Sequence, residues 1–145
     1  EFPGLPHRCQ WVSEIAGVSY YNDSKGTNIG ACNAALQGLG DAKNVILLAG
    51  GQGKGAKFSD LKETLKVYGK LLIVFGEDAD LIASTLQKLI STKKVSSLQE
   101  AVKFASEQAE GGDIVLLSPA CASFDMFDNY EKRGEAFIEA VEALH

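Results

Sequence analysis

Hydrophobic and polar positions follow two different periods along the first forty residues. Residues 11–15 and 18–21 are short β-favouring runs separated by Ala16-Gly17, a spacing typical of a β-hairpin. From Thr27 the period lengthens to that of a helix, because the apolar residues Ile29, Cys32, Ala35, Leu36 and Leu39 fall on one helical face. This part of the chain predicts an antiparallel pair of strands followed by a helix.

Continuous apolar runs alternate with helical periods in the rest of the chain. Residues 45–49, 71–75 and 114–117 are runs typical of strands that are covered on both faces. Four helices are predicted between and after these runs, together with a short strand around Val95. The first is capped by Ser59 and packs through Leu61 and Leu65, and the third opens with a capping box at residues 97–100. The second packs through Leu81, Ile82, Leu86, Leu89 and Ile90, and the last through Phe137, Ile138, Val141 and Leu144. Alternation of this kind predicts a Rossmann-like α/β fold: an open, mostly parallel sheet with an antiparallel hairpin strand and helices on both faces.

Three loops of this fold are expected to share one rim. In open α/β sheets, ligands bind at the carboxyl ends of the strands. Residues 22–27, 50–55 and 118–130 each follow a predicted strand. We therefore expect any binding site to be built from these loops.

Composition narrows the classes of protein that the chain can represent. The 145 residues fit a single domain, and 46% hydrophobic with 23% charged residues is ordinary for a soluble globular protein. A net charge of -5 without a basic stripe argues against nucleic acid as a partner. No apolar run approaches the roughly 20 residues of a membrane span, and no signal-peptide pattern opens the chain, so a cytoplasmic protein is expected. Because the sequence begins Glu1-Phe2, we expect it to be part of a longer protein.

The cysteines predict neither a disulfide framework nor a metal site. Cys9, Cys32 and Cys121 are odd in number and far apart, without a C-x-x-C motif. Cys121 lies in the third loop, where a nucleophile is conceivable. Only two histidines exist, and nothing places a base beside this thiol, so a buried packing residue is the favoured interpretation.

The first loop concentrates polar groups in front of a helix. Residues 22–28 read Asn-Asp-Ser-Lys-Gly-Thr-Asn, and the following helix end adds free N–H groups and a dipole that favours an anion. The alternative is a capping turn in which Asp23 or Thr27 caps the helix and Lys25 points to solvent.

The second loop, residues 50–55, combines glycines with Lys54 and suits a phosphate or carboxylate. It also matches a loose dinucleotide fingerprint, Gly51-x-Gly53-x-x-Ala56, with Glu77 and Asp78 as ribose acceptors, although that fingerprint normally follows the first strand of its domain. The phosphate-loop pattern is absent, because Gly53-Lys54 has neither the upstream glycine nor the following Ser or Thr. A flexible turn with a solvated Lys54 is the remaining interpretation.

Four segments in order resemble the Mur ligase family. They are Gly-Leu-Pro-His-Arg (4–8), Asn-Asp-Ser-Lys-Gly-Thr-Asn (22–28), Gly-Gly-Gln-Gly-Lys-Gly (50–55) and Leu-Ser-Pro-Ala-Cys-Ala-Ser (117–123), with Glu131-x-Arg133-Gly134 before the last helix. The resemblance is to the C-terminal domain of the D-glutamate-adding members and runs from about Phe2 to the end. The sequence departs from the family pattern at Gln52, where aspartate is frequent, Gly26, where alanine is common, and Tyr130, where phenylalanine is usual.

This resemblance implies an ATP-dependent ligase of peptidoglycan precursor synthesis. In the family, ATP phosphorylates the carboxylate of UDP-N-acetylmuramoyl-L-alanine, and the amine of D-glutamate attacks the acyl phosphate. The resemblance further implies that ATP and Mg²⁺ are bound mainly by a central domain, and that this domain and an N-terminal UDP-binding domain lie outside the chain. We expect a monomer in which residues 1–145 form one amino-acid-binding domain that is inactive alone.

Site residues follow from the resemblance position by position. Thr27 and Lys54 are implied to hold the α-carboxylate of D-glutamate, and Ser123 and the backbone near Tyr130 its side-chain carboxylate. Two separated anion sites suit a dicarboxylic substrate.

Three further residues are implied to serve the nucleotide. Arg8 is expected at its phosphates, Asp23 at its ribose, and Lys25 beside the transferring phosphoryl group, where a fixed positive charge stabilises developing anions. Alternatives that stay open are a sister Mur or folylpolyglutamate-type ligase with another amino acid in the pocket, and a non-catalytic α/β binding module.

Overall fold

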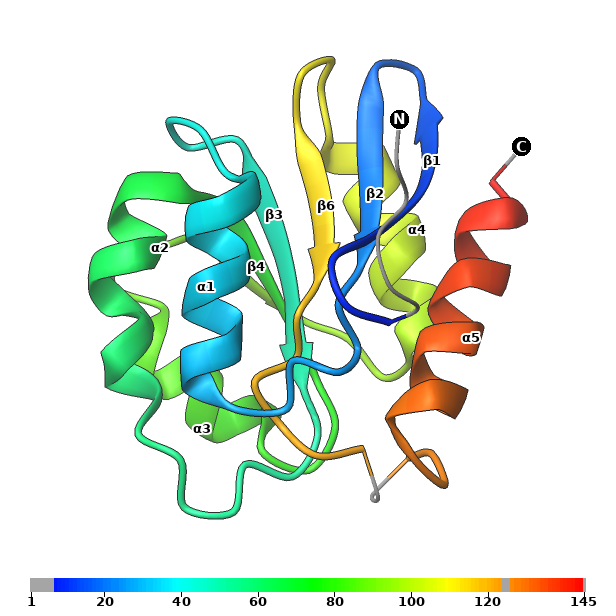
Figure 1. The fold of residues 1–145 in the computed structure, drawn as a ribbon. Helices are drawn as coiled ribbons and strands as arrows, with labels where there is room; N and C mark the ends of the chain where they lie inside the picture. The colour runs from blue at the N-terminus through cyan, green and yellow to red at the C-terminus, as the bar shows by residue number, and fades with distance from the viewer. Residues whose placement is uncertain (1–6, 124–125, 145) are drawn as a thin grey trace.

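The computed structural model describes residues 7–123 and 126–144, and in these residues one sheet of six strands has the order β1-β2-β6-β3-β4-β5 (Figure 1). The strands are β1 (Gln10–Ile15), β2 (Val18–Asn22), β3 (Val45–Gly50), β4 (Gly69–Phe75), β5 (Thr92–Lys94) and β6 (Ile114–Leu117). The helices are α1 (Ile29–Leu39), the 3-10 helix η1 (Phe58–Leu61), α2 (Lys62–Tyr68), α3 (Ala79–Leu86), α4 (Leu98–Gln108) and α5 (Tyr130–Glu142). Only β1 runs antiparallel to its neighbour, so the predicted fold class is confirmed.

Strand β3 divides two hydrophobic cores. All six of its residues are buried, and because side chains alternate along a strand, Leu47 and Ala49 enter one core while Ile46 and Leu48 enter the other. Helices α1, α2 and α3 cover the first core, and α4 and α5 cover the second (Figure 1). Burying each large aliphatic side chain stabilises the fold by about 1.5–3 kcal/mol.

The hairpin lies where its spacing predicts. Ile15 pairs with Val18, and the connecting Ala16 and Gly17 both have positive φ, 54° and 80°. Such a turn follows the twist of the two strands.

Several helix boundaries differ from the prediction. Ser59 does not cap a helix, because it lies inside η1, which passes directly into α2 without a side-chain cap at either start. Leu81 is 50% exposed, and Leu89 lies beyond the end of α3 and is 39% exposed, so neither belongs to the buried face. Short elements of this kind are decided by tertiary packing rather than by periodicity.

The capping box at α4 is only half as predicted. The Ser97 hydroxyl accepts a hydrogen bond from Glu100 N at 3.0 Å. The Glu100 carboxylate, however, reaches one residue further back and accepts from Ser96 N at 2.7 Å and from Ser96 Oγ at 2.8 Å. Two consecutive serines therefore bind the start of the helix, Ser97 as an acceptor and Ser96 as a donor.

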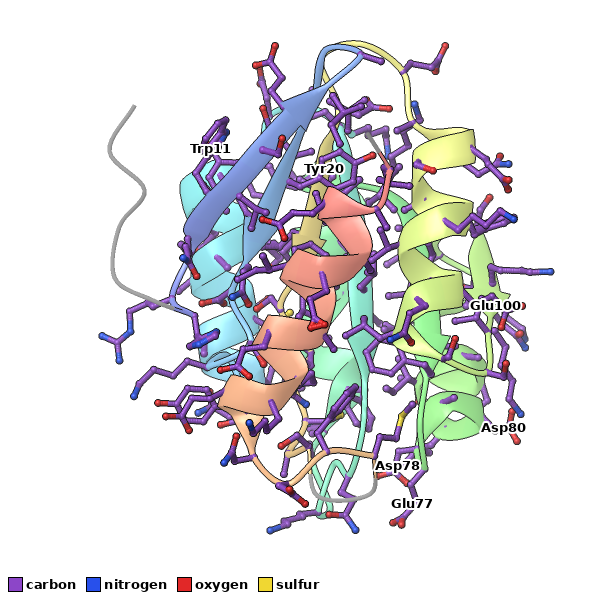
Figure 2. All side chains as sticks on the ribbon, turned by 90° about the vertical axis from the view of Figure 1, so that its right-hand side faces the viewer. Trp11, Tyr20, Glu77, Asp78, Asp80 and Glu100 are labelled. Carbon is purple, nitrogen blue, oxygen red and sulfur yellow. The ribbon has the colours of Figure 1, made fainter. Side chains whose placement is uncertain are left out.

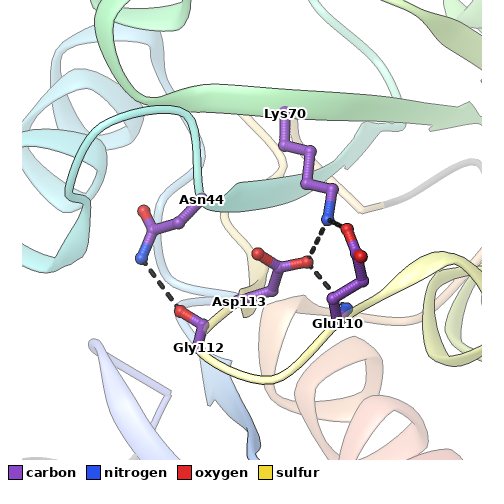
Figure 3. A network of polar contacts seen from close by, with 5 residues as sticks. All are labelled: Asn44, Lys70, Glu110, Gly112 and Asp113. Atoms are coloured by element: carbon purple, nitrogen blue, oxygen red, sulfur yellow. Dashed lines mark hydrogen bonds and ion pairs between the residues drawn. The ribbon is translucent and has the colours of Figure 1, made fainter.

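A polar network ties the sheet together at the amino ends of the parallel strands (Figure 3). Lys70, at the start of β4, donates to the Asp113 carboxylate before β6 and to Glu110 at 2.8 Å. Asp113 also accepts from Glu110 N at 2.8 Å, while Asn44 donates to Gly112 O at 3.2 Å. The network thus joins the starts of β3, β4 and β6.

Replacing Lys70 by methionine is expected to lower the free energy of unfolding by about 1 kcal/mol near pH 8. Hydrogen bonds to Asp113 and Glu110 raise the pKa of Lys70 above 10.5 in the folded protein. A raised pKa means that this contribution is complete below pH 10.5 and is lost as the pH rises through the folded value. Urea unfolding of both proteins from pH 8 to 12 tests this, and a difference that stays constant over this range would contradict it.

Candidate functional site

The carboxyl ends of β2, β3 and β6 meet at the lower rim of the sheet in Figure 1. After β3 the chain enters η1 and α2 on one face, whereas after β6 it enters α5 on the other face. Neighbouring strands whose connections leave to opposite faces open a crevice, which is the usual ligand site of such sheets. The order of the strands therefore predicts such a crevice between the loops that follow β3 and β6.

Residues 118–123 connect the other two loops through backbone hydrogen bonds. Ala120 N donates to Gly26 O at 2.9 Å, which joins the first loop. Gln52 and Ala122 exchange two hydrogen bonds of 2.9 Å as an antiparallel bridge, which joins the second. The expectation that three loops share one rim is confirmed.

Asn28, rather than Asp23 or Thr27, caps α1. Its side chain accepts from Ala31 N at 2.8 Å. Asp23 is instead 4% exposed, and its carboxylate accepts from Ser118 Oγ at 2.7 Å and from Cys9 N at 3.1 Å. Burial raises the pKa of Asp23, and the hydrogen bonds from Ser118 and Cys9 partly oppose that rise. The capping-turn interpretation of these two residues is therefore wrong.

A cavity of about 600 Å³ opens beside the first loop. Arg8, Lys25 and Thr27 line it together with Tyr130, and one wall is formed by the alanines of α1 at positions 31, 34 and 35. Lys25 Nζ donates to Tyr130 Oη at 3.3 Å and lies 5.1 Å from the centre of its ring. A phenylalanine would retain the ring but not the hydroxyl. The cavity combines cationic groups with a small apolar wall.

Arg133 joins the first and third loops to α5. Its side chain is buried, with 1% exposed, and its Nε donates to Ser24 Oγ at 3.0 Å. Its Nη1 donates to Cys121 O at 2.9 Å and its Nη2 to Ser24 O at 2.8 Å. Ser24 Oγ in turn donates to Tyr130 O at 2.5 Å. The sequence offered Arg133 only as a motif position, since its partners are distant along the chain.

The segment before β1 docks on the same loop. His7 O accepts from Lys25 N at 2.9 Å, and the His7 ring shares a 2.9 Å hydrogen bond with the Asn22 amide. Gly134 of α5 makes room for this ring, because a Cβ there would lie 2.2 Å from His7 Nδ1. The hydrophobic periodicity of the sequence did not predict this contact between His7 and the first loop.

The second loop, residues 50–55, is called the glycine loop below. Gly51 has φ 123°, and a Cβ there would lie 2.2 Å from Ala122 O, so the bridge to the third loop requires glycine. The Gln52 amide donates to Glu77 at 3.5 Å. Lys54 is exposed at φ 52°, which is the left-handed region. The loop has a defined shape and is not a free turn.

The cysteines have the character of packing residues. Cys121 and Cys32 are fully buried, and none of the three cysteines is part of a disulfide. Burial is the main cause that raises the pKa of Cys9 to about 11 and that of Cys32 to about 12. Neither of these two thiols has the lowered pKa of a nucleophile.

The candidate residues fall into two neighbouring groups. Arg8, Asp23, Lys25, Thr27 and Tyr130 line the cavity. Lys54, which is exposed, and Ser123, which is 3% exposed, lie outside its lining, on the two loops joined by the Gln52–Ala122 bridge. Within residues 7–123 and 126–144, no group of three or more His, Cys, Asp and Glu side chains could hold a metal ion, and no helix is long and apolar enough to cross a membrane.

The α/β sheet carries cationic and hydroxyl groups on three interlocked rim loops, a set of side chains suited to an anionic ligand. A family model described as "Mur ligase, glutamate ligase domain" matches residues 7–121. The chain therefore belongs to the Mur ligase family as its glutamate ligase domain, which confirms the resemblance in the motifs.

Sequence relatives agree on the branch of the family. The chain is 57% identical to a UDP-N-acetylmuramoylalanine--D-glutamate ligase of Coxiella burnetii and 55% identical to the ligase of the same name from Pseudomonas aeruginosa, over 99% of its own length in both cases. It spans about a third of the length of these relatives, 33% and 32%.

Solved structures share the fold at low sequence identity. FolC of E. coli in complex with ADP superposes with a TM-score of 0.68 at 19% identity, over 97% of this chain and 32% of that one. UDP-N-acetylmuramate-alanine ligase of Thermotoga maritima gives a TM-score of 0.65 at 14% identity, over 99% of this chain and 32% of that one. At these identities the likeness concerns the fold.

Proposed function

We propose that the chain is the D-glutamate-binding domain of an ATP-dependent ligase that adds D-glutamate to UDP-N-acetylmuramoyl-L-alanine. The observation that carries the proposal is the interlocking of three rim loops that bear Lys25, Lys54 and Ser123 in a chain 57% identical to a ligase named for this reaction. The reaction would place the protein in peptidoglycan synthesis, and so in bacterial cell shape and division, as a cytoplasmic monomer.

Two anion sites on the rim suit the two carboxylates of D-glutamate. Lys54 and Thr27 offer an ammonium and a hydroxyl for the α-carboxylate, since charge-assisted hydrogen bonds are the strong ones. Ser123 and the N–H of Tyr130 serve the side-chain carboxylate. Tyr130 is the first residue of α5, so its N–H has no partner within the helix and points along the favourable end of the helix dipole.

The cavity beside the first loop fits the phosphates and ribose of ATP. Arg8 and Lys25 supply positive charge there, and the largely buried carboxylate of Asp23, bonded to Ser118 and Cys9, lies in the lining. ATP, when bound, supplies the phosphoryl group that activates the substrate carboxylate. The hydrogen bond to Tyr130 holds the Lys25 ammonium at the wall of the cavity, where it would stabilise charge on the transferring group. We propose that Mg²⁺ and most of the nucleotide are held by a central domain outside this chain.

The purified 145-residue chain is expected neither to hydrolyse ATP nor to form the amide, because it has no phosphate loop. Joined to the upstream domains of its ligase, it is expected to support amide formation with D-glutamate and not with L-alanine or diaminopimelate. Release of phosphate and amide product measures both. Amide synthesis by the chain alone, or preference of the complete enzyme for another amino acid, would contradict the proposal.

A further inference from the structure

The carboxylate of Asp78 binds the glycine loop and not its own helix. Asp78 occupies the N-cap position of α3, where an aspartate usually accepts a hydrogen bond from the first turn, yet it makes no such bond. Its Oδ2 accepts from Gly53 N at 2.7 Å instead. Helix α3 therefore lacks the cap that its sequence would supply, and the carboxylate serves the loop.

The backbone of the same residue holds the loop a second time. Asp78 N donates to Gly51 O at 3.0 Å, so Asp78 is bonded on both sides of Gln52. Contact at Gly53 is close, because a Cβ there would lie 2.9 Å from Asp78 Oδ2 and 2.6 Å from Phe58 Cζ. Figure 2 shows Asp78 beside Glu77 at the lower rim, whereas Asp80 projects from the outer side of α3. We call the two hydrogen bonds of Asp78 to Gly51 and Gly53 the clasp. Of the three neighbouring acids Glu77, Asp78 and Asp80, it is Asp78 that forms it.

Lys54 follows directly on the clasped peptide. Its φ of 52° is a conformation that a residue with a side chain keeps only when its surroundings hold it there. Gln52, two residues earlier, is bridged to Ala122 of the third loop, and Gly53 is bonded to Asp78. These two attachments fix the backbone from which the Lys54 ammonium extends.

We infer that Asp78 is a positioning residue for substrate binding: its hydrogen bond from Gly53 N sets the place of the Lys54 ammonium that receives the α-carboxylate of the amino acid. The inference rests on the proposed function for the identity of that ligand. The clasp itself is a property of the chain. Asp78, which the dinucleotide hypothesis placed at a ribose, is thus assigned to the loop.

The test compares Asp78→Ala with Asp78→Asn and Asp80→Ala in the complete ligase. Asp78→Ala is expected to raise KM for D-glutamate about tenfold, with KM for ATP changed less than about twofold, because a displaced Lys54 weakens one charge-assisted contact. Asp78→Asn keeps an acceptor oxygen and should recover most of the affinity. Asp80→Ala, which removes an exposed partner of Lys94 at 2.8 Å, should leave both constants unchanged. An equal rise in both KM values, or none, would overturn the inference.

A double variant separates positioning from general stabilisation. If Asp78 acts through Lys54, Asp78→Ala should add nothing to the KM of a Lys54→Ala enzyme, whereas independent effects would multiply. Nuclear magnetic resonance of the 145-residue chain needs no substrate: Asp78→Ala should shift the Gly53 and Lys54 amide signals and speed their hydrogen exchange, and Asp80→Ala should not. Unmoved amides would refute the clasp, while a wild-type enzyme that rejects D-glutamate would refute only the proposed function.

Discussion

Replacing Arg133 by alanine is expected to lower the free energy of unfolding by about 3–5 kcal/mol. The variant empties a fully buried site and removes the hydrogen bonds from Arg133 to Ser24 and Cys121, which leaves the carbonyl groups of these two residues without their guanidinium donor. A buried carbonyl that loses its partner costs about 1–3 kcal/mol. Urea unfolding of the wild-type and variant chains measures the difference.

Lys132→Ala is the matched control for Arg133. Lys132 is the neighbouring cation on α5, but it is exposed and lies 3.7 Å from Glu135 in a surface pair. Such pairs contribute little, so its loss should cost less than about 0.5 kcal/mol. A cost for Arg133→Ala as small as this would mean that the loops keep their places without the guanidinium.

Replacing Lys54 by alanine is expected to raise KM for D-glutamate about 100-fold in the complete ligase. A hydrogen bond to a charged group contributes about 1.5–3 kcal/mol, and each 1.4 kcal/mol corresponds to a factor of ten. Lys54 is exposed, so the free energy of unfolding should barely change. Initial rates at varied D-glutamate concentration give the result.

Lys57→Ala provides the comparison for Lys54. Lys57 is exposed three residues further along and lies 4.0 Å from Asp60, outside the glycine loop. Its removal lowers the net charge by the same amount but should leave KM unchanged. Equal effects of the two substitutions would show that Lys54 acts only through the overall charge, and the assignment of the α-carboxylate to it would be wrong.

The sheet could be predicted because burial on both faces leaves a clear pattern. The run at residues 114–117 coincides with β6, and the run at residues 45–49 falls one residue short of the end of β3. The hairpin was predictable for a different reason, since Ala16-Gly17 is a local turn signal. The short elements were harder to predict. The 3-10 helix η1, for example, is a single turn whose start depends on packing against α1, α2 and α3.

The site also has a part that the sequence predicts and a part that it does not. Polar residues in the first loop and glycines in the second are visible in the sequence, and they predicted that these loops share one rim, as they do. The groups that hold the loops in place cannot be recognised in the sequence, because their partners are far away along the chain. Arg133 binds Ser24 across 109 positions, and Asp78 binds Gly53 across 25. Asp23 was expected at the ribose of a nucleotide or as a helix cap, whereas its carboxylate is buried and accepts a hydrogen bond from Ser118, 95 positions away.

The structure shows what the side chains do at the three positions that depart from the family pattern. The Tyr130 hydroxyl gives Lys25 an acceptor. A Cβ at position 26 would lie 2.6 Å from Asp23 Oδ2 and 2.7 Å from Ser118 Oγ, so glycine permits their hydrogen bond in its present place. Gln52 makes its bridge with backbone atoms and directs its amide toward Glu77.

Two of the connections of the third loop, the bond from Ala120 N to Gly26 O and the Gln52–Ala122 pair, use main-chain atoms alone. Any residue that tolerates the local backbone can occupy position 52 or 122 without breaking them. The side chains at these two positions can therefore change while the main-chain connections of the rim persist.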